Sequence, residues 1–437
     1  GGLCLLLGNS HTDASAAAPH AATTVGSMLV IIVATERLTG KVLWGISWQV
    51  RRLLSVAVAV AFGLRYGGMA LPQSVIIDMP YHMKWLRTLL AGDWQALYLP
   101  GGLSEVPPEW GMSLLIPKSP LFYVAVAPLS TLPFDLETLV KWSTCLIDAT
   151  IVLFGYWFTR RVGGSSKAAL AAAFLYAAMP LAFRALSYGI QPTIFAQWLA
   201  TGLLAFVLVA STKGWRPVSL IVAVLLATLT LLSFPTVAVF VTLIVVVAPV
   251  AWKLARRGSP ANRQLSWQPY LVLAAAWLLA FVAYYGLYVA PVTASAVALL
   301  GTAPGGGTTV RWPGGVVELL LWTGDYLASI LPLLLSIVGL LLLLVRRHVR
   351  DAQKRATILV ITWLAILPLF VAANYKIDMI GKHLFFTMLP VAVTGGVGLF
   401  ALNMRNTWGR RLAGLLLSTV AWQALVFWVE RLVRAST

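Results

Sequence analysis

The sequence predicts an all-α, polytopic transmembrane protein with about eleven helical spans. Hydrophobic residues make up 59% of the 437 residues and charged residues only 11%, whereas a soluble domain carries about 25% charged residues. The mean hydropathy of +0.85 agrees with this composition. Long apolar runs recur along the chain, and mostly short polar connections separate them. Lipid is therefore the expected solvent for most of the surface.

Each apolar run is close to the ~20 residues that a helix needs to cross the hydrocarbon core of a bilayer. Inside lipid, every backbone N–H and C=O must be hydrogen-bonded within the protein, and a helix achieves this by itself. The predicted spans are residues 53–77, 139–158, 168–186, 191–210, 218–233, 236–252, 269–290, 319–345, 358–373, 384–402 and 412–429.

Residues 1–50 are set apart from residues 51–437, which form the predicted transmembrane domain. The apolar run at 28–34 is shorter than a span requires, so this segment stays unassigned or forms an additional anchor. Two outer connections, 78–137 and 291–318, are long. Loops of that length in a compact protein are usually functional or disordered.

The basic residues follow the spans. The formal net charge is +18. Many cations occur as pairs beside apolar runs, namely Arg51-Arg52, Arg160-Arg161, Arg256-Arg257, Arg346-Arg347 and Arg410-Arg411. Such loops face the cytoplasm and attract anionic lipid headgroups. Placing the first pair in the cytoplasm puts the other pairs on the same side. The charge therefore indicates contact with membrane lipids and excludes a nucleic-acid partner.

The acidic residues sort to the opposite side. With this topology, only Asp351 clearly lies inside, and ten of the fourteen acidic residues fall in outer loops or at outer ends of spans: Asp78, Asp93, Glu105, Glu109, Asp135, Glu137, Glu318, Asp325, Asp378 and Glu430. Acidic residues contribute little to membrane orientation, so this asymmetry needs another cause. An active site that faces outward is one such cause.

The first outer loop begins with an amphipathic helix. Within residues 79–90, one face carries Met83, Leu86, Leu89 and Leu90, which predicts a helix lying in the membrane interface. Asp78 directly precedes this helix, so capping of the helix is one explanation for it. The other explanation is functional. His82 lies one turn beyond Asp78, and a carboxylate at the outer mouth of a span can act as the general base for an acceptor hydroxyl.

Three motifs of this loop are Asp78-Met79-Pro80-Tyr81-His82, Gly92-Asp93-Trp94 and Pro117-Lys118-Ser119-Pro120-Leu121-Phe122-Tyr123. Their order resembles the first-loop pattern of bacterial and archaeal membrane proteins of the GT-C superfamily. That superfamily includes protein mannosyltransferases, aminoarabinose transferases and oligosaccharyltransferases. The resemblance implies a many-spanning helical fold, interfacial helices in this loop, an essential acidic residue there and a polyprenyl-phosphate sugar donor. Asp78 matches the position of that acidic residue.

The chain departs from the family pattern in one respect. Many members carry two adjacent acidic residues or an Asp-x-Asp pair in this loop, whereas Met79 and Pro80 follow Asp78 here. A divalent cation prefers several oxygen ligands. No spacing argument links Asp78 to the further carboxylates of the loop, which are Asp93, Glu105 and Glu109. The sequence therefore gives a divalent cation no clear ligand set, and it establishes no cofactor.

A sugar donor of this kind leaves a lipid phosphate behind, and the developing charge needs cationic or hydrogen-bond donors. Lys376, Lys382 and His383 lie in a short outer connection, which resembles the basic loop before a late span of GT-C proteins. Lys382 and His383 are the preferred phosphate contacts. Snorkelling of the lysines to lipid headgroups is the alternative. A basic cluster on the outer side opposes the positive-inside bias, and this favours a functional role.

Other ionisable groups lie near or inside the spans. Arg184 and Tyr188 can add a guanidinium and a hydroxyl donor to a phosphate site, although snorkelling also explains Arg184. Asp325 is a secondary candidate carboxylate at the mouth of another span. Arg65 and Asp148 lie inside spans, where ionisable groups are usually paired. The sequence does not tell whether they pair with each other.

These residues lead to one functional hypothesis and two alternatives. The hypothesis is an inverting glycosyltransferase of a prokaryotic cytoplasmic membrane, which moves a hexose or pentose from a polyprenyl-phosphate donor to a glycan, lipid or protein acceptor at the outer face. Asp78 is the catalytic residue, and the substrate-binding candidates are His82, Lys376, Lys382, His383, Arg184, Tyr188 and Asp325. The alternatives are a lipid-linked sugar transporter, which typically shows repeated halves, and a non-catalytic subunit with partners in a membrane complex.

Overall fold

The computed structural model describes residues 14–42, 46–69, 78–102, 117–187, 189–255, 267–300, 330–346, 350–377 and 380–434, and within 367–383 it describes no side chains. Every regular element in the described residues is a helix. The long helices are α2 (Ala14–Val42), α3 (Trp48–Gly67), α7 (Leu136–Arg161), α10 (Gln191–Lys213), α11 (Pro217–Ser233), α12 (Pro235–Ala255), α13 (Gln268–Ala283), α16 (Leu331–Val345), α17 (Asp351–Ile377), α18 (Ile380–Arg405) and α19 (Thr407–Arg434). The shorter ones are α4 (Met79–Leu90), α5 (Gln95–Tyr98), α6 (Leu121–Val126), η3 (Ala127–Thr131), α8 (Ser166–Ala178), α9 (Pro180–Ser187), η4 (Tyr285–Tyr288) and α14 (Val289–Leu300).

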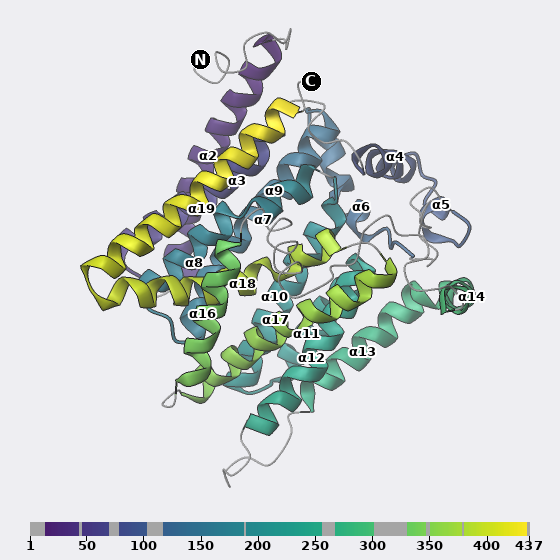
Figure 1. Cartoon of the computed structure of the whole chain (residues 1–437). Coiled ribbons are helices and arrows are strands. Elements are labelled where there is room, and N and C mark those ends of the chain that lie inside the picture. Colours follow the sequence, from purple (N-terminus) through teal and green to yellow (C-terminus); the bar gives the residue numbers. More distant parts are fainter. Residues whose placement is uncertain are drawn as a thin grey trace.

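The long helices run side by side in one bundle, and α4, α5 and α14 lie at one end of it (Figure 1). Small residues allow the closest packing, as between α16 and α18. A Cβ atom on Gly339 would lie 1.8 Å from the backbone oxygen of Thr394. The hydroxyls of Ser336 and Thr394 are 2.7 Å apart across this contact. Close backbone approach at small residues and hydrogen bonds between helices are the usual ways in which membrane helices associate.

Each of the eleven apolar segments predicted as spans overlaps at least one helix. In the described residues, seven helices are long and apolar enough to cross a membrane, or up to eight if a bent pair counts as one span. That pair is α13 with the following helix, which meet at 66°. The transmembrane fold is therefore confirmed, whereas the number of about eleven spans is not. Several of the helices are short for a span, because α11 has 17 residues and α16 has 15.

The N-terminal segment contains a long helix that the hydropathy of its central run does not reveal. Helix α2 extends from Ala14 to Val42, and its part Pro19–Gly40 is long and apolar enough to cross a membrane. Threonine, serine and glycine residues flank the apolar core of α2 and dilute its hydropathy. A packed helix accepts such residues, and α2 lies against α3 along its length. The outer connection 291–318 also begins differently from the expectation, because its first residues continue α14.

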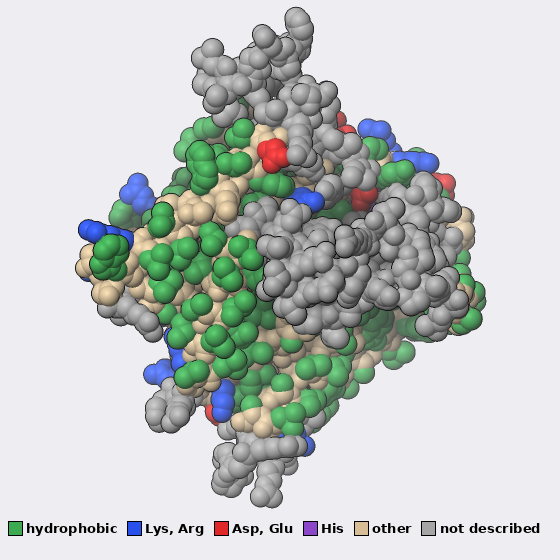
Figure 2. Space-filling view, in the orientation of Figure 1, with side chains coloured by type: hydrophobic (Ala, Val, Ile, Leu, Met, Phe, Trp, Pro, Cys, Tyr) green, Lys and Arg blue, Asp and Glu red, His purple; other side chains and the backbone are tan. Residues whose placement is uncertain are grey.

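The charged helix ends gather at two opposite ends of the bundle. At one end, Arg346 donates a hydrogen bond of 3.3 Å to the backbone oxygen of Gly163, and Arg355 donates one of 2.7 Å to that of Ser211. We call this the inner end, because it carries the predicted cytoplasmic cations. At the other, outer end, α5 contacts η4 through a hydrogen bond of 3.1 Å from Tyr288 Oη to the backbone oxygen of Tyr98. Figure 2 shows a broad hydrophobic surface with basic side chains at its left and lower edges.

The two ionisable residues inside the spans form an ion pair with each other. Arg65 of α3 and Asp148 of α7 are 1% and 0% exposed, and Arg65 Nε donates to the Asp148 carboxylate. The other carboxylate oxygen accepts a bond of 2.8 Å from Tyr176 Oη of α8. Three helices therefore meet at one fully buried charge pair, which satisfies the requirement for pairing at this depth.

Arg65 also completes the hydrogen bonding at the break between α8 and α9. Pro180 has no N–H, so the backbone oxygen of Tyr176 loses its usual helical donor four residues on. Arg65 donates instead, at 3.3 Å to Tyr176 O and at 3.2 Å to Ala177 O. The guanidinium thus holds the point at which the span bends, and α9 leads from there to the outer end.

Candidate functional site

The first outer loop places α4 against the outer end of the bundle (Figure 1). The helix buries Met79, His82, Met83, Trp85 and Leu86. It exposes Lys84, Arg87 and Leu90. The expected amphipathic helix is thus present, but Leu90 is not on its buried face. His82 and Trp85 take part in that face instead, because aromatic residues of α6 pack against it.

Asp78 directly precedes α4, and its side chain makes no capping hydrogen bond to that helix. Its backbone has φ −95° and ψ −15°, whereas a capping residue typically has extended backbone. Capping as the sufficient explanation for Asp78 is therefore wrong. The residue is only 6% exposed, and its negative charge adds to the effect of burial in raising the pKa of Tyr123.

Gly189, in the turn between α9 and α10, packs closely against the backbone of Asp78 and Met79. This glycine joins α9 to α10 with φ +78°, a left-handed conformation that other residues rarely adopt. A Cβ atom at Gly189 would lie 2.6 Å from Met79 N and 3.2 Å from the backbone of Asp78. Gln191, at the start of α10, adds a bond of 3.2 Å from its side-chain amide to Met79 Sδ. The α9–α10 turn and the start of α4 are therefore in direct backbone contact.

Replacing Gly189 with Ala is expected to displace Asp78 and to lower any activity that depends on it by about tenfold or more. A 1 Å misplacement of a reacting group can cost about a hundredfold in rate. Gly92→Ala is the matched control, because Gly92 has φ +88° but a Cβ atom there would meet nothing within 4 Å. Activity assays and thermal unfolding of both variants test this. Equal loss of activity in the two variants would show that strain alone, without displacement of Asp78, is the cause.

His82 belongs to a buried aromatic cluster between α4 and α6. It is 5% exposed, and its ring lies 5.6 Å from Trp85 and 6.4 Å from Phe122, measured between ring centroids. Tyr123 Oη is 2.6 Å from His82 Nδ1. Burial, and next the negative charge of Asp78, raises the pKa of Tyr123 well above its ordinary value. The hydroxyl therefore keeps its proton and can donate a hydrogen bond to Nδ1.

Lys118 is a cation of the site that residue spacing alone does not reveal. Its Nζ lies 5.1 Å from the ring centroid of Trp85, within the range of a cation–π contact. It is half-buried, and it directly precedes Ser119, whose hydroxyl accepts a bond of 3.2 Å from Leu121 N at the start of α6. Lys118 and Tyr123 both belong to the third first-loop motif. The motif itself was therefore the signal that could have identified them as partners of α4.

The structure brings together only some of the predicted site residues. Asp78 directly precedes α4 and His82 lies on it, and Arg184 lies on α9, the helix that leads to the Gly189 turn. Arg184 is half-buried, and its backbone oxygen accepts a bond of 2.8 Å from Ser187. Tyr188 and Asp325 lie outside the described residues. The side chains of Lys376, Lys382 and His383 do too, although the backbone puts Lys376 at the end of α17 and the other two in the first turn of α18.

The carboxylates that could have supplemented Asp78 as metal ligands are engaged elsewhere or fall outside the described part of the chain. Asp93 is exposed and caps α5, because it accepts a bond of 3.3 Å from Ala96 N. Glu105 and Glu109 lie in the interval 103–116, which is not described. Within the described ranges, no group of three or more His, Cys, Asp and Glu side chains comes together.

Solved structures match this chain by fold, whereas the sequence comparisons give no match. No family model and no curated protein matches the sequence. The crystal structure of the Archaeoglobus fulgidus oligosaccharyltransferase in the apo form matches with a TM-score of 0.55 and 14% identity, over 90% of this chain and 56% of that chain. Archaeal oligosaccharyltransferase AglB from Archaeoglobus fulgidus, in complex with an inhibitory peptide and a dolichol-phosphate, matches with a TM-score of 0.57 and 14% identity, over 89% and 56%.

The chain thus spans about half the length of the solved structures that it matches. An identity of 14% shows a shared fold rather than a shared activity. The match nevertheless agrees with the superfamily that the first-loop motifs indicated independently. The chain has the fold that is seen in the solved structures of an archaeal oligosaccharyltransferase.

Proposed function

We propose that this chain is a membrane glycosyltransferase that moves a sugar from a polyprenyl-phosphate-linked donor to an acceptor at the outer face of a prokaryotic cytoplasmic membrane. The observation that carries the proposal is the position of Asp78. Its carboxylate makes no capping bond to α4, lies beside the buried Tyr123–His82 pair, and is held by the backbone contact with Gly189. Proteins with this fold include an oligosaccharyltransferase whose structure contains a dolichol-phosphate, which supports a lipid-linked donor.

In the proposed reaction, Asp78 accepts the proton of an acceptor hydroxyl as the acceptor oxygen bonds to the anomeric carbon of the sugar. The bond between that carbon and the phosphate oxygen breaks, and the electron pair leaves with the lipid phosphate. A single displacement of this kind inverts the anomeric configuration. The carboxylate must be within hydrogen-bond reach of the hydroxyl, and it must be ionised to act as a base.

The leaving phosphate requires cations or hydrogen-bond donors at the outer end of the bundle. Lys382 and His383 are proposed for this role, with Lys376 and Arg184 as further cations. Their helices support the assignment: α18 begins at Ile380, directly after the outer end of α17, and it packs against α9, which carries Arg184. His82, Tyr188 and Asp325 are proposed to bind the sugar or the acceptor.

The test is a transfer assay that does not require knowledge of the acceptor. The purified chain is reconstituted in vesicles with dolichyl- or undecaprenyl-phosphate-linked hexoses and pentoses, together with a membrane extract as the source of acceptors. Release of the free polyprenyl phosphate is measured by mass spectrometry, because every acceptor yields this product. Time-dependent release that requires the chain is the expected result.

The same vesicles separate the alternatives. A lipid-linked sugar transporter would move the intact donor between leaflets without releasing polyprenyl phosphate. A non-catalytic subunit would do neither, although it would remain folded and would bind partners. Either of these outcomes, obtained with all donors, would contradict the proposal.

A further inference from the structure

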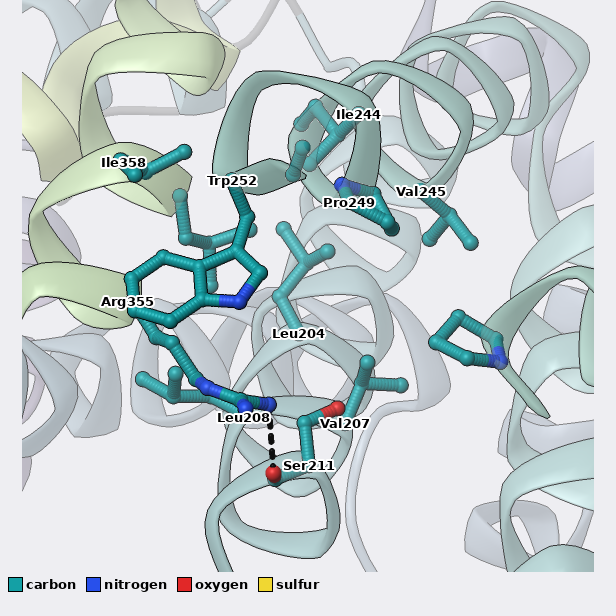
Figure 3. A pocket seen from close by; sticks show the side chains of 13 residues that line it. Leu204, Val207, Leu208, Ser211, Ile244, Val245, Pro249, Trp252, Arg355 and Ile358 are labelled. Carbon is teal, nitrogen blue, oxygen red and sulfur yellow. Dashed lines mark hydrogen bonds between the residues drawn. The ribbon is translucent and has the colours of Figure 1, made fainter. Parts of the chain in front are cut away.

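A small apolar crevice lies at the inner end of the bundle, between α10, α12 and α17 (Figure 3). Its volume is about 80 Å³. The walls include Leu204 and Leu208 of α10, Ile244 and Val245 of α12 and Leu359 of α17. These five side chains are buried, so the crevice reaches into the packed interior of the bundle. We call it the inner crevice.

Arg355 contributes a positive charge to the lining of the inner crevice. Arg355 of α17 donates a hydrogen bond of 2.7 Å to the backbone oxygen of Ser211, and its guanidinium carbon lies 4.8 Å from the ring centroid of Trp252. Figure 3 shows the guanidinium next to the Trp252 ring, with apolar side chains behind them. Both contacts orient the planar guanidinium. An arginine held in this way is well suited to a phosphate oxygen, because the guanidinium is a planar, rigid group of N–H donors.

The inner crevice is accessible from the surface of the bundle. Val207, Ala248, Pro249, Trp252 and Arg355 belong to its lining and are half-buried rather than buried. Further exposed cations are at the same end of the same helices, namely Lys213, Lys253, Arg350 and Lys354. Asp351, on the first turn of α17, is the acidic residue closest along the chain to Arg355. The entrance is therefore apolar and half-open, and it is surrounded mainly by positive charge.

The position of the inner crevice separates it from the proposed transfer site. Gln191 at the outer start of α10 contacts α4, whereas Ser211 near the end of the same helix contacts Arg355. With a rise of about 1.5 Å per residue, these two points on α10 are about 30 Å apart. This distance is the thickness of a hydrocarbon core. A phosphate group at Arg355 would therefore lie in the opposite leaflet from a donor phosphate beside Asp78.

We propose that the inner crevice binds an anionic phospholipid of the inner leaflet, with the phosphate at Arg355 and one acyl chain between α10, α12 and α17. The apolar walls match a hydrocarbon chain, and the small volume suits one narrow chain rather than a ring system. The cations at the inner ends of α10, α12 and α17 match a negative headgroup, since basic clusters at the cytoplasmic surface attract anionic lipids. A free phosphate ion has no apolar part that could contact the apolar walls.

The experiment measures lipid binding to the full chain. Delipidated protein in detergent is titrated with phosphatidylglycerol and with phosphatidylcholine of the same acyl chains, and bound lipid is measured by native mass spectrometry. Three variants are compared with the wild type. Arg355→Gln removes the headgroup contact, Ala248→Phe fills the inner crevice without touching a charge, and Lys354→Gln removes an exposed neighbouring cation as the matched control.

The wild type is expected to bind phosphatidylglycerol about tenfold more tightly than phosphatidylcholine, as one charge-assisted hydrogen bond predicts. Arg355→Gln is expected to abolish this preference and Ala248→Phe to weaken both lipids. Lys354→Gln should reduce the preference only slightly, because Lys354 is one of several surrounding cations. Ala248→Phe keeps all contacts of Arg355, so it tests the proposal even if Arg355→Gln folds poorly.

Four results would overturn the proposal. The first is equal binding of the two lipids by the wild type. The second is an equal loss in Arg355→Gln and Lys354→Gln, which would indicate diffuse surface charge. The third is displacement of phosphatidylglycerol by equimolar inorganic phosphate, which would indicate a free-anion site. The fourth is displacement by equimolar polyprenyl phosphate, which would assign the inner crevice to the carrier lipid.

Discussion

Asp78→Asn is expected to lower the rate of sugar transfer by about two to four orders of magnitude, the usual contribution of a positioned general base. The substitution keeps the shape of the side chain and removes its charge and basicity. It should not remove a helix cap, because Asp78 makes no capping hydrogen bond to α4. The measurement is the release of polyprenyl phosphate by the variant and the wild type, with thermal unfolding as the check on folding.

Asp93→Asn is the matched control for Asp78→Asn. Asp93 lies in the same outer loop and caps α5 with a bond of 3.3 Å to Ala96 N. Asparagine caps helices about as well as aspartate, so this variant should keep both its stability and its rate. If Asp78→Asn and Asp93→Asn transfer sugar equally fast, Asp78 has no role as a base. A loss in both variants would indicate a general electrostatic effect of the loop.

Asp148→Ala is expected to destabilise the protein by about 3–5 kcal/mol, since it leaves the charge of Arg65 buried without its partner. The pair is 1% and 0% exposed, and the hydroxyl of Tyr176 also loses its acceptor. The free energy of unfolding in mixed detergent micelles measures the effect. Glu137→Gln is the matched control, because Glu137 and Lys141 form a half-exposed helical pair at 2.6 Å. Such pairs contribute less than about 0.5 kcal/mol.

The double variant Arg65→Met with Asp148→Leu refines this test. Replacing a buried ion pair by apolar residues is often neutral for stability. Here we expect only partial recovery, because Arg65 also donates to the backbone oxygens of Tyr176 and Ala177 at the break before Pro180. Full recovery would mean that the α8–α9 break does not need the guanidinium. A change in Asp148→Ala no larger than that in Glu137→Gln would contradict the structural role of the pair altogether.

The buried pair and the proposed site are connected through α9. Arg65 holds the point at which α8 ends, α9 runs from Pro180 to Ser187, and the following turn brings Gly189 against the backbone of Asp78. A shift of α9 would therefore be transmitted to the start of α4. This connection explains how a charge pair deep in the bundle can contribute to the position of a carboxylate at its outer end.

The sequence alone determined the class of the protein, the positions of most helices and the place of α4. These properties follow from the local pattern of apolar residues, because each membrane helix satisfies its own backbone and must be apolar over a fixed length. The same reasoning failed for α2, where threonine, serine and glycine dilute the hydropathy although the helix packs against α3. The predicted number of about eleven spans is not confirmed, because in the described residues seven helices, or up to eight, are long and apolar enough to cross a membrane.

Only the tertiary structure decided which side chains meet. Arg65 and Asp148 are 83 residues apart in sequence, and His82 and Tyr123 are 41 apart. Hydropathy predicted how far along its helix each residue lies. Whether two residues meet depends on how each helix is rotated about its axis. Whether Asp78 caps α4 was likewise open until its side chain was seen to make no capping bond to that helix. Pairing, rotation and capping are non-local properties, and they arise only when the helices pack together.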